Sequence, residues 1–234
     1  MMLINSKKLS YVYSDGSFGI QNITFQIANN TKIGLLGANG AGKTTFALVL
    51  LGLLKPYDGF LSVLELEVIS KNLDEIRRRV GLLFQEPDNQ MFMPTLIEDV
   101  ALGLLQRGFS KQSAESKAME LLNYFRLGYL ASKYPGHLSL GQKRLVALAG
   151  VLAAEPDLLI LDEPTSQLDA RGKRLLIAHL EALPQSMLII SHDINMIKSL
   201  CNRVILFDKG KVVAQEETSI LLNEQQLLRR YGVI

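Results

Sequence analysis

The sequence has few of the features that mark secreted or nucleic-acid-binding proteins. Among its 234 residues there is one cysteine and no tryptophan, so no disulfide can form within the chain. Three histidines without paired spacing give no transition-metal motif. The 25 basic and 23 acidic residues leave a net charge of +2, too little for the sustained positive field of phosphate-backbone binders. We therefore expect no nucleic-acid partner.

Long apolar runs are also missing. The longest lie at residues 47–54 and 145–154, well short of the roughly 18 residues that span a bilayer. No charged-then-apolar leader precedes Leu3, so we expect a soluble, intracellular chain. With 48% hydrophobic residues it is long enough for one large core or a core with an appended lobe. The single cysteine, Cys201, is expected to pack at the end of a helix.

A glycine-rich stretch after an apolar run is the most informative motif present. Residues 37–44 read Gly-Ala-Asn-Gly-Ala-Gly-Lys-Thr, a pattern that holds polyphosphate at a strand-to-helix turn. Residues 32–37 predict the strand and residues 44–51 the helix. Lys43 is predicted to reach the β- and γ-phosphates, and the Thr44 hydroxyl to bind Mg2+. The remaining predicted nucleotide contacts here are Gly37, Ala38, Asn39, Gly40, Ala41, Gly42 and Thr45.

Apolar patterning predicts an α/β fold with an inserted helical lobe. Alternating residues in 3–12 and 22–27 predict antiparallel strands. Short continuous apolar runs at 80–84, 158–161, 187–190 and 204–207 predict buried parallel strands. Helical patterns at 111–124, with Ser110 as N-cap, and at 141–154 fall between two of these strands. We predict a core of residues 1–87 and 157–234 and a helical subdomain of residues 88–156.

Polar residues follow three of the predicted parallel strands. Asp162 and Glu163 end one strand, on the sheet edge where ligands of open α/β folds bind. Asp162 is predicted to support Mg2+, and Glu163 to polarise a water that attacks the γ-phosphorus. His192 follows the next strand and is a candidate γ-phosphate contact. Gln85 follows another, where its amide oxygen would complete the Mg2+ shell or hold the attacking water, with a polar loop residue as the alternative.

Together with Leu138-Ser-Leu-Gly-Gln142 and Ser166-Gln-Leu-Asp169, these motifs resemble the ATPase subunits of ATP-binding cassette (ABC) transporters over essentially the whole chain. The resemblance implies a P-loop NTPase core with a mostly parallel sheet, an N-terminal antiparallel β-subdomain and a helical subdomain that carries the signature sequence. It implies that Tyr13 stacks on adenine, although Tyr11 competes for this role and packing within a strand is the alternative. Catalysis would depend on Glu163, His192, Gln85 and Lys43.

The resemblance also implies a head-to-tail dimer, homo- or heteromeric, with two ATP molecules between the subunits. Ser139, Gly141 and Gln142 would approach the ATP of the other subunit, and Asp169 would reach across the interface. The sequence departs from the family where Leu140 replaces a signature glycine, which matters if the backbone there must approach phosphate closely or take positive φ. Lys143-Arg144-Leu145 shifts an arginine, and Gln167 replaces a small residue.

Residues 84–103 are similar to the ATPases of energy-coupling-factor importers for cobalt, nickel and vitamins. This similarity implies ATP and Mg2+ as cofactors, integral membrane subunits as partners, and a peripheral position on the cytoplasmic side of the membrane. Met91, Phe92 and Met93 are candidates for a groove that binds a helix of the membrane partner, with ordinary burial as the alternative. An exporter ATPase and a soluble cassette acting on ribosomes or DNA are the competing hypotheses.

Overall fold

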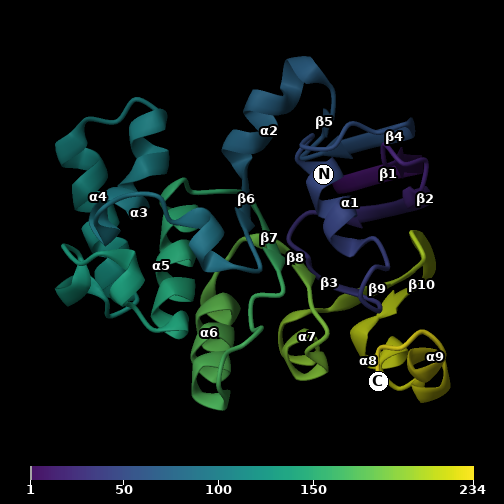
Figure 1. Cartoon of the computed structure of the whole chain (residues 1–234). Helices are drawn as coiled ribbons and strands as arrows, with labels where there is room; N and C mark the ends of the chain where they lie inside the picture. The colour runs from purple at the N-terminus through teal and green to yellow at the C-terminus, as the bar shows by residue number, and fades with distance from the viewer. Residues whose placement is uncertain (1) are drawn as a thin grey trace.

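The computed structural model describes residues 2–234, which form an α/β fold with two sheets (Figure 1). The N-terminal sheet is antiparallel, in the order β2-β1-β4-β5. Its alternating pattern buries one face, as in Ile23, Phe25 and Ile27 of β2. The strands are β1 (Met2–Val12), β2 (Phe18–Ala28), β4 (Asp58–Val63) and β5 (Leu66–Glu67).

The second sheet is mostly parallel and has the order β10-β9-β3-β8-β7-β6. All neighbouring strands pair in parallel except β9 and β10, which form an antiparallel hairpin. The strand β6 lies at one edge. The strands are β3 (Lys32–Leu36), β6 (Val80–Leu83), β7 (Leu158–Asp162), β8 (Ser186–Ile190), β9 (Arg203–Asp208) and β10 (Lys211–Glu217).

Both faces of the parallel sheet are buried, and each face belongs to a separate hydrophobic cluster. Leu158 and Ile160 of β7 face the cluster that includes the antiparallel sheet and α1 (Lys43–Leu50). Leu159 and Leu161 face the other cluster, which includes the inserted helices. The remaining core helices are α2 (Leu73–Arg79), α6 (Ala170–Ala182), α7 (Ile194–Leu200), α8 (Thr218–Leu221) and α9 (Gln225–Arg230).

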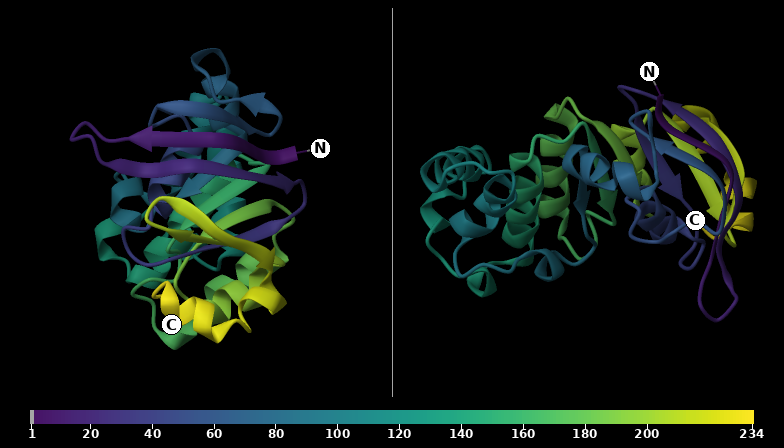
Figure 2. Two further views of the ribbon diagram at one scale, coloured as in Figure 1. Left: turned by 90° about the vertical axis from the view of Figure 1, so that its right-hand side faces the viewer. Right: turned by 90° about the horizontal axis from the view of Figure 1, so that it is seen from above.

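Three helices between β6 and β7 form the inserted lobe, at the opposite end of the molecule from the antiparallel sheet (Figure 2). They are α3 (Leu96–Gln106), α4 (Lys111–Tyr124) and α5 (Leu140–Ala153). The predicted α4 has its observed bounds, with Ser110 Oγ accepting from Ser113 N at 3.3 Å. The predicted α5 is shifted by one residue. The lobe boundaries at 88 and 156 stay a prediction, because the lobe shares one apolar cluster with the sheet.

Cys201 is buried at the C-terminal end of α7, and burial raises the pKa of its thiol to about 12. Within residues 2–234, no helix has both the length and the apolar character that a membrane crossing requires. The same range contains no cluster of three or more His, Cys, Asp or Glu side chains placed to bind a metal ion.

Candidate functional site

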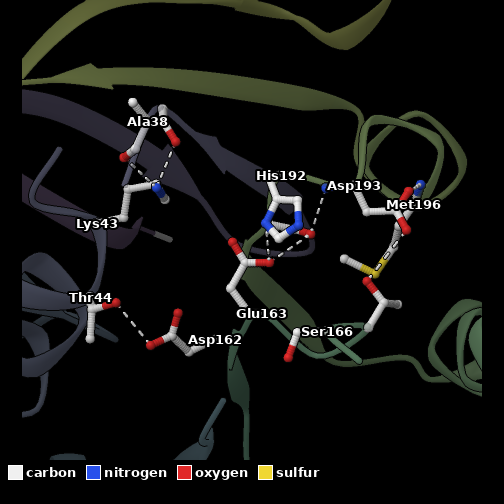
Figure 3. Close-up of polar contacts among 12 residues, drawn as sticks. Ala38, Lys43, Thr44, Asp162, Glu163, Ser166, His192, Asp193 and Met196 are labelled. Carbon is white, nitrogen blue, oxygen red and sulfur yellow. Dashed lines mark hydrogen bonds and ion pairs between the residues drawn. The ribbon is translucent and has the colours of Figure 1, made fainter. Parts of the chain in front are cut away.

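The glycine-rich loop connects β3 to α1 and folds back over the side chain of Lys43. Lys43 Nζ donates to the backbone carbonyls of Gly37 at 2.6 Å and Ala38 at 2.9 Å (Figure 3). The lysine side chain is buried here, and desolvation lowers its pKa although Glu163 and Asp162 oppose this shift. The first two residues of the loop therefore hold the Lys43 ammonium group in place.

Close backbone packing fixes this loop against the antiparallel sheet. Gly42 has φ +100°, and a Cβ there would lie 2.5 Å from the carbonyl oxygen of Gly19 in β2 and 3.2 Å from Gly210 Cα. Gly210 N donates to Ala41 O at 2.9 Å, and Gly210 O accepts from Gln21 N at 2.7 Å. Three segments thus meet backbone to backbone, which only glycine permits at position 42.

Thr44 and Asp162 supply oxygen atoms at the same edge of the sheet. Thr44 Oγ1, in the first turn of α1, donates to Asp162 Oδ2 at 2.9 Å (Figure 3). Burial raises the pKa of the Asp162 carboxyl, and this is the largest influence on it, partly offset by the Thr44 hydrogen bond. A hydroxyl and a desolvated carboxylate next to Lys43 are hard oxygen ligands, so the residues present fit Mg2+.

Glu163 and His192 come together from the ends of β7 and β8. His192 Nδ1 lies 2.9 Å from Glu163 Oε2, and Ser191 Oγ donates to the same oxygen at 3.4 Å (Figure 3). Because an ionised carboxylate can only accept, Nδ1 is the donor in this contact, and Nε2 takes no part in it. Glu163 is 8% exposed and has φ +46°. Its carboxylate is thus oriented by two neighbours, as a positioned base requires.

Tyr13, not Tyr11, lines the cavity beside the glycine-rich loop. The Tyr13 hydroxyl and Thr45 Oγ1 share a hydrogen bond of 2.6 Å, and the Tyr13 ring is 40% exposed. Tyr11 packs edge-on against it, with ring centroids 5.0 Å apart. Phe18, at the start of β2, is a second exposed aromatic ring beside the cavity. Phe18 was not predicted from the sequence, although it is a second aromatic residue in the same hairpin as Tyr13.

These groups surround one cavity of about 490 Å³. Its lining combines the antiparallel sheet, the glycine-rich loop and the ends of β6, β7 and β8. Gly37 and Ala38 do not line the cavity, but their carbonyl oxygens accept hydrogen bonds from Lys43 Nζ, which does. The predicted residues that line the cavity are Tyr13, Asn39, Gly40, Ala41, Gly42, Lys43, Thr44, Thr45, Gln85, Asp162, Glu163 and His192, and the residues not predicted are Phe18, Gly19 and Ile190.

Besides Gly37 and Ala38, four predicted site residues do not line this cavity: Ser139, Gly141, Gln142 and Asp169. Ser139 is the N-cap of α5 and forms a capping box, in which Gln142 Oε1 accepts from Ser139 N at 2.9 Å. Asp169 caps α6 by accepting from Gly172 N at 2.6 Å. Leu140 is the first residue of α5 and has no positive φ, so backbone conformation does not demand glycine here. The role of Ser139, Gly141, Gln142 and Asp169 at a phosphate stays a prediction.

Gln85 opens a loop that is held against β6 by the side chain of Gln90. Gln90 Nε2 donates to Leu82 O at 2.9 Å, and Gln90 Oε1 accepts from Phe84 N at 3.2 Å. The Gln90 amide therefore bonds the backbone groups with which a neighbouring strand would otherwise pair at the edge strand β6. This arrangement keeps Gln85 at the end of β6, where it borders the cavity.

Known proteins resemble this chain in both sequence and fold. The ABC transporter family matches residues 20–166. A candidate ABC transporter ATP-binding protein of Geobacter sulfurreducens is 38% identical over 226 residues, which cover 97% of this chain and 91% of that protein. The energy-coupling factor transporter ATP-binding protein EcfA of Carboxydothermus hydrogenoformans is 36% identical over 235 residues, which cover 99% of this chain and 87% of that protein.

Solved structures of ABC transporter ATPases also resemble this chain. The structure of cbiO1 from Clostridium perfringens, described as part of the ABC transporter complex cbiONQ, superposes with a TM-score of 0.84 at 31% identity and covers 98% of this chain and 94% of that one. A dimer of the ATP-binding cassette MJ0796, bound to ADP and Pi in a post-hydrolysis state, also gives a TM-score of 0.84 at 26% identity. This match covers 92% of the present chain and 98% of the MJ0796 chain.

Proposed function

Because this chain belongs to the ABC transporter family and is an ATPase of that family, we propose that it powers an importer of the energy-coupling-factor type. The likeness to EcfA supports this assignment, as does the likeness to cbiO1 of an ABC transporter complex. The proposed cargo is a transition-metal ion such as cobalt or nickel, or a vitamin. The chain would lie on the cytoplasmic side of the membrane.

The observation that carries the ATPase mechanism is the convergence of two polar pairs on one cavity, Thr44 with Asp162 and Glu163 with His192. On binding ATP, Lys43 would exchange its two backbone carbonyls for β- and γ-phosphate oxygens. Thr44, Asp162 and Gln85 would hold Mg2+. The ion supplies charge neutralisation on the phosphate oxygens. Tyr13, with Phe18 beside it, would contact the adenine ring.

Hydrolysis follows from the position of Glu163. A water oxygen forms a bond to the γ-phosphorus, the bond between that phosphorus and the β,γ-bridging oxygen breaks, and the water proton passes to Glu163 Oε. His192 would hold the carboxylate through Nδ1 and face the γ-phosphate with Nε2. The products are ADP and inorganic phosphate. Positioned base catalysis contributes about 10² to 10⁴-fold in rate.

A second ATPase subunit is part of the proposal, because the signature residues lie away from this chain's own cavity. In a head-to-tail pair, the Ser139 end of α5 and Asp169 of one subunit would approach the ATP of the other. The dimeric form of MJ0796 supports such a pair. The α5 N-terminus would add its backbone N–H groups and dipole to the γ-phosphate. ATP would thus hold the pair together, and hydrolysis would release it.

A groove of about 180 Å³ between η2 (Pro87–Gln90), α3 and α5 supports a membrane partner. Met91 lines the groove, and Phe92 beside it is 72% exposed. Asp99 also lines it. Asp99 Oδ1 accepts from Phe92 N at 3.0 Å and Met93 N at 3.1 Å, while its buried Oδ2 has no partner among the described residues. We propose that this groove binds a helix of an integral membrane subunit, with a basic side chain opposite Asp99.

The test is a substitution of the proposed base. Glu163→Gln keeps the shape of the side chain but cannot accept the proton, so we expect ATP hydrolysis to fall about 10² to 10⁴-fold while ATP binding persists. Light scattering should then show an ATP-dependent dimer. Glu155→Gln is the matched control, because Glu155 is exposed in an ion pair with Lys117. Near-normal turnover in Glu163→Gln would reject the assigned base, and co-purification with ribosomes, not membrane proteins, would reject transport.

A further inference from the structure

Arg144 is the most unusual charged residue in the described part of the chain. It lies in the second turn of α5, five residues after Ser139, and only 1% of it is exposed. No carboxylate within residues 2–234 comes within 4.0 Å of its guanidinium nitrogens. Its Nε is buried without a hydrogen-bond partner. Burial of an unpaired cation is costly, so its persistence requires a reason other than stability.

The Arg144 guanidinium joins the helical lobe to the segments that follow two adjacent strands. Nη1 donates to Phe84 O, at the end of β6, at 2.9 Å. Nη2 lies 3.5 Å from both the carbonyl and the hydroxyl oxygen of Ser166, four residues after β7. Since β6 and β7 are neighbours, one side chain contacts the loop that carries Gln85 and the turn that follows Glu163.

The contact with Phe84 acts directly on Gln85. The carbonyl of Phe84 and the N–H of Gln85 belong to one planar peptide group, so a hydrogen bond to that oxygen fixes the direction in which the Gln85 residue leaves the strand. The preceding residue of α5 adds a second connection, because Lys143 Nζ lies 2.6 Å from Asp88 Oδ1, three residues after Gln85. The beginning of α5 therefore contacts the chain on both sides of Gln85, at Phe84 and at Asp88.

We propose that Arg144 is a positioning residue for Gln85, which makes the placement of that amide in the ATP cavity depend on the seating of the signature helix against the β6 end. This inference rests on the proposed ATPase function. When α5 lies against the loop, Phe84 O is held and Gln85 borders the cavity. When α5 moves away, the peptide group is released and Gln85 loses its fixed direction.

The experiment compares Arg144→Met and Arg144→Lys in steady-state and single-turnover ATP hydrolysis by the full chain. Loss of one charge-assisted hydrogen bond corresponds to a fall of about 10- to 100-fold in kcat, with the KM for ATP changed by less than about threefold. Lysine keeps the charge but serves one carbonyl at a time, so its kcat should lie between those of wild type and Arg144→Met. Lys117→Met, which removes an exposed ion pair, should behave as wild type.

A double-mutant cycle separates positioning from a merely structural role. If Arg144 acts through Gln85, Arg144→Met should lower the residual kcat of Gln85→Ala by less than about twofold. The melting temperature of Arg144→Met should equal or exceed that of wild type, since methionine removes a buried unpaired charge. Independent, multiplying effects of the two substitutions would overturn the proposal, as would a wild-type kcat or a parallel loss of folding and ATP affinity in both Arg144 variants.

Failure of this inference is distinguishable from failure of the proposed function. Wild-type hydrolysis and its loss in Glu163→Gln test the ATPase mechanism without any change at Arg144. If both of those results hold while the Arg144→Met and Gln85→Ala effects multiply, the ATPase assignment stands and the positioning role is rejected. If the wild-type chain does not hydrolyse ATP with Mg2+, the proposed function itself is refuted, and this inference with it.

Discussion

Gly42→Ala should separate backbone strain from steric overlap in the glycine-rich loop. Gly42 and Gly40 have similar positive φ values, +100° and +78°. A Cβ at Gly40 meets nothing within 4 Å, whereas one at Gly42 lies 2.5 Å from Gly19 O and 3.2 Å from Gly210 Cα. Gly40→Ala therefore incurs the left-handed backbone cost alone, about 1–2 kcal/mol. Gly42→Ala adds an overlap of backbone with backbone, which costs about 1–3 kcal/mol more.

Urea unfolding without nucleotide measures this difference. We expect the free energy of unfolding of Gly42→Ala to lie about 1–3 kcal/mol below that of Gly40→Ala, with equal denaturant slopes. Because the overlap forces the loop away from β2, which carries Gly19, ATP affinity should fall as well. Equal unfolding midpoints for the two variants would refute the reasoning, since the close contact would then carry no energetic consequence.

Three further results are expected. Lys43→Ala should weaken ATP binding about 10- to 100-fold in a titration, because two charge-assisted phosphate bonds are lost; unchanged affinity would contradict the assignment. His179, on α6, packs against Phe125 at the end of α4, with ring centroids 4.7 Å apart, and burial lowers its pKa. Its stabilising contribution should be full above the unfolded pKa of about 6.5 and lost as pH falls through the lower folded pKa, so His179→Gln should flatten stability profiles measured between about pH 5 and 7. Cys201, whose pKa is raised to about 12, should react with thiol reagents only at the rate of unfolding; fast labelling of the folded chain would contradict its burial.

Elements governed by local signals were predictable from the sequence. Ser110 caps α4 and sets its first residue, and the continuous apolar runs gave the parallel strands because both of their faces are buried. The spacing around Lys43 likewise predicted a strand-to-helix turn. Each of these features depends on residues close together in the chain, so the pattern contains the necessary information.

Features that depend on distant packing were not predictable. Nothing near Arg144 in sequence indicates that its guanidinium is enclosed by Phe84 and Ser166, 60 and 22 residues away. His192 was predicted to face phosphate, and its contact with Glu163 emerged only when the ends of β7 and β8 were placed side by side. The roles of Ser139 and Asp169 stay predictions, because a cap and a phosphate contact call for the same residue types.

The side chain of Gln90 also covers part of the free edge of the parallel sheet. Strand β6 ends the parallel sheet, and an exposed margin of this kind is a template on which another chain can add a strand. By bonding Leu82 O and Phe84 N, the amide occupies the sites where such an addition would begin. Two molecules are therefore discouraged from joining sheet to sheet at this margin. Gln90 also lines the groove beside α3. A partner that displaces the Gln90 side chain from β6 would therefore expose this short strand edge only while the partner is bound.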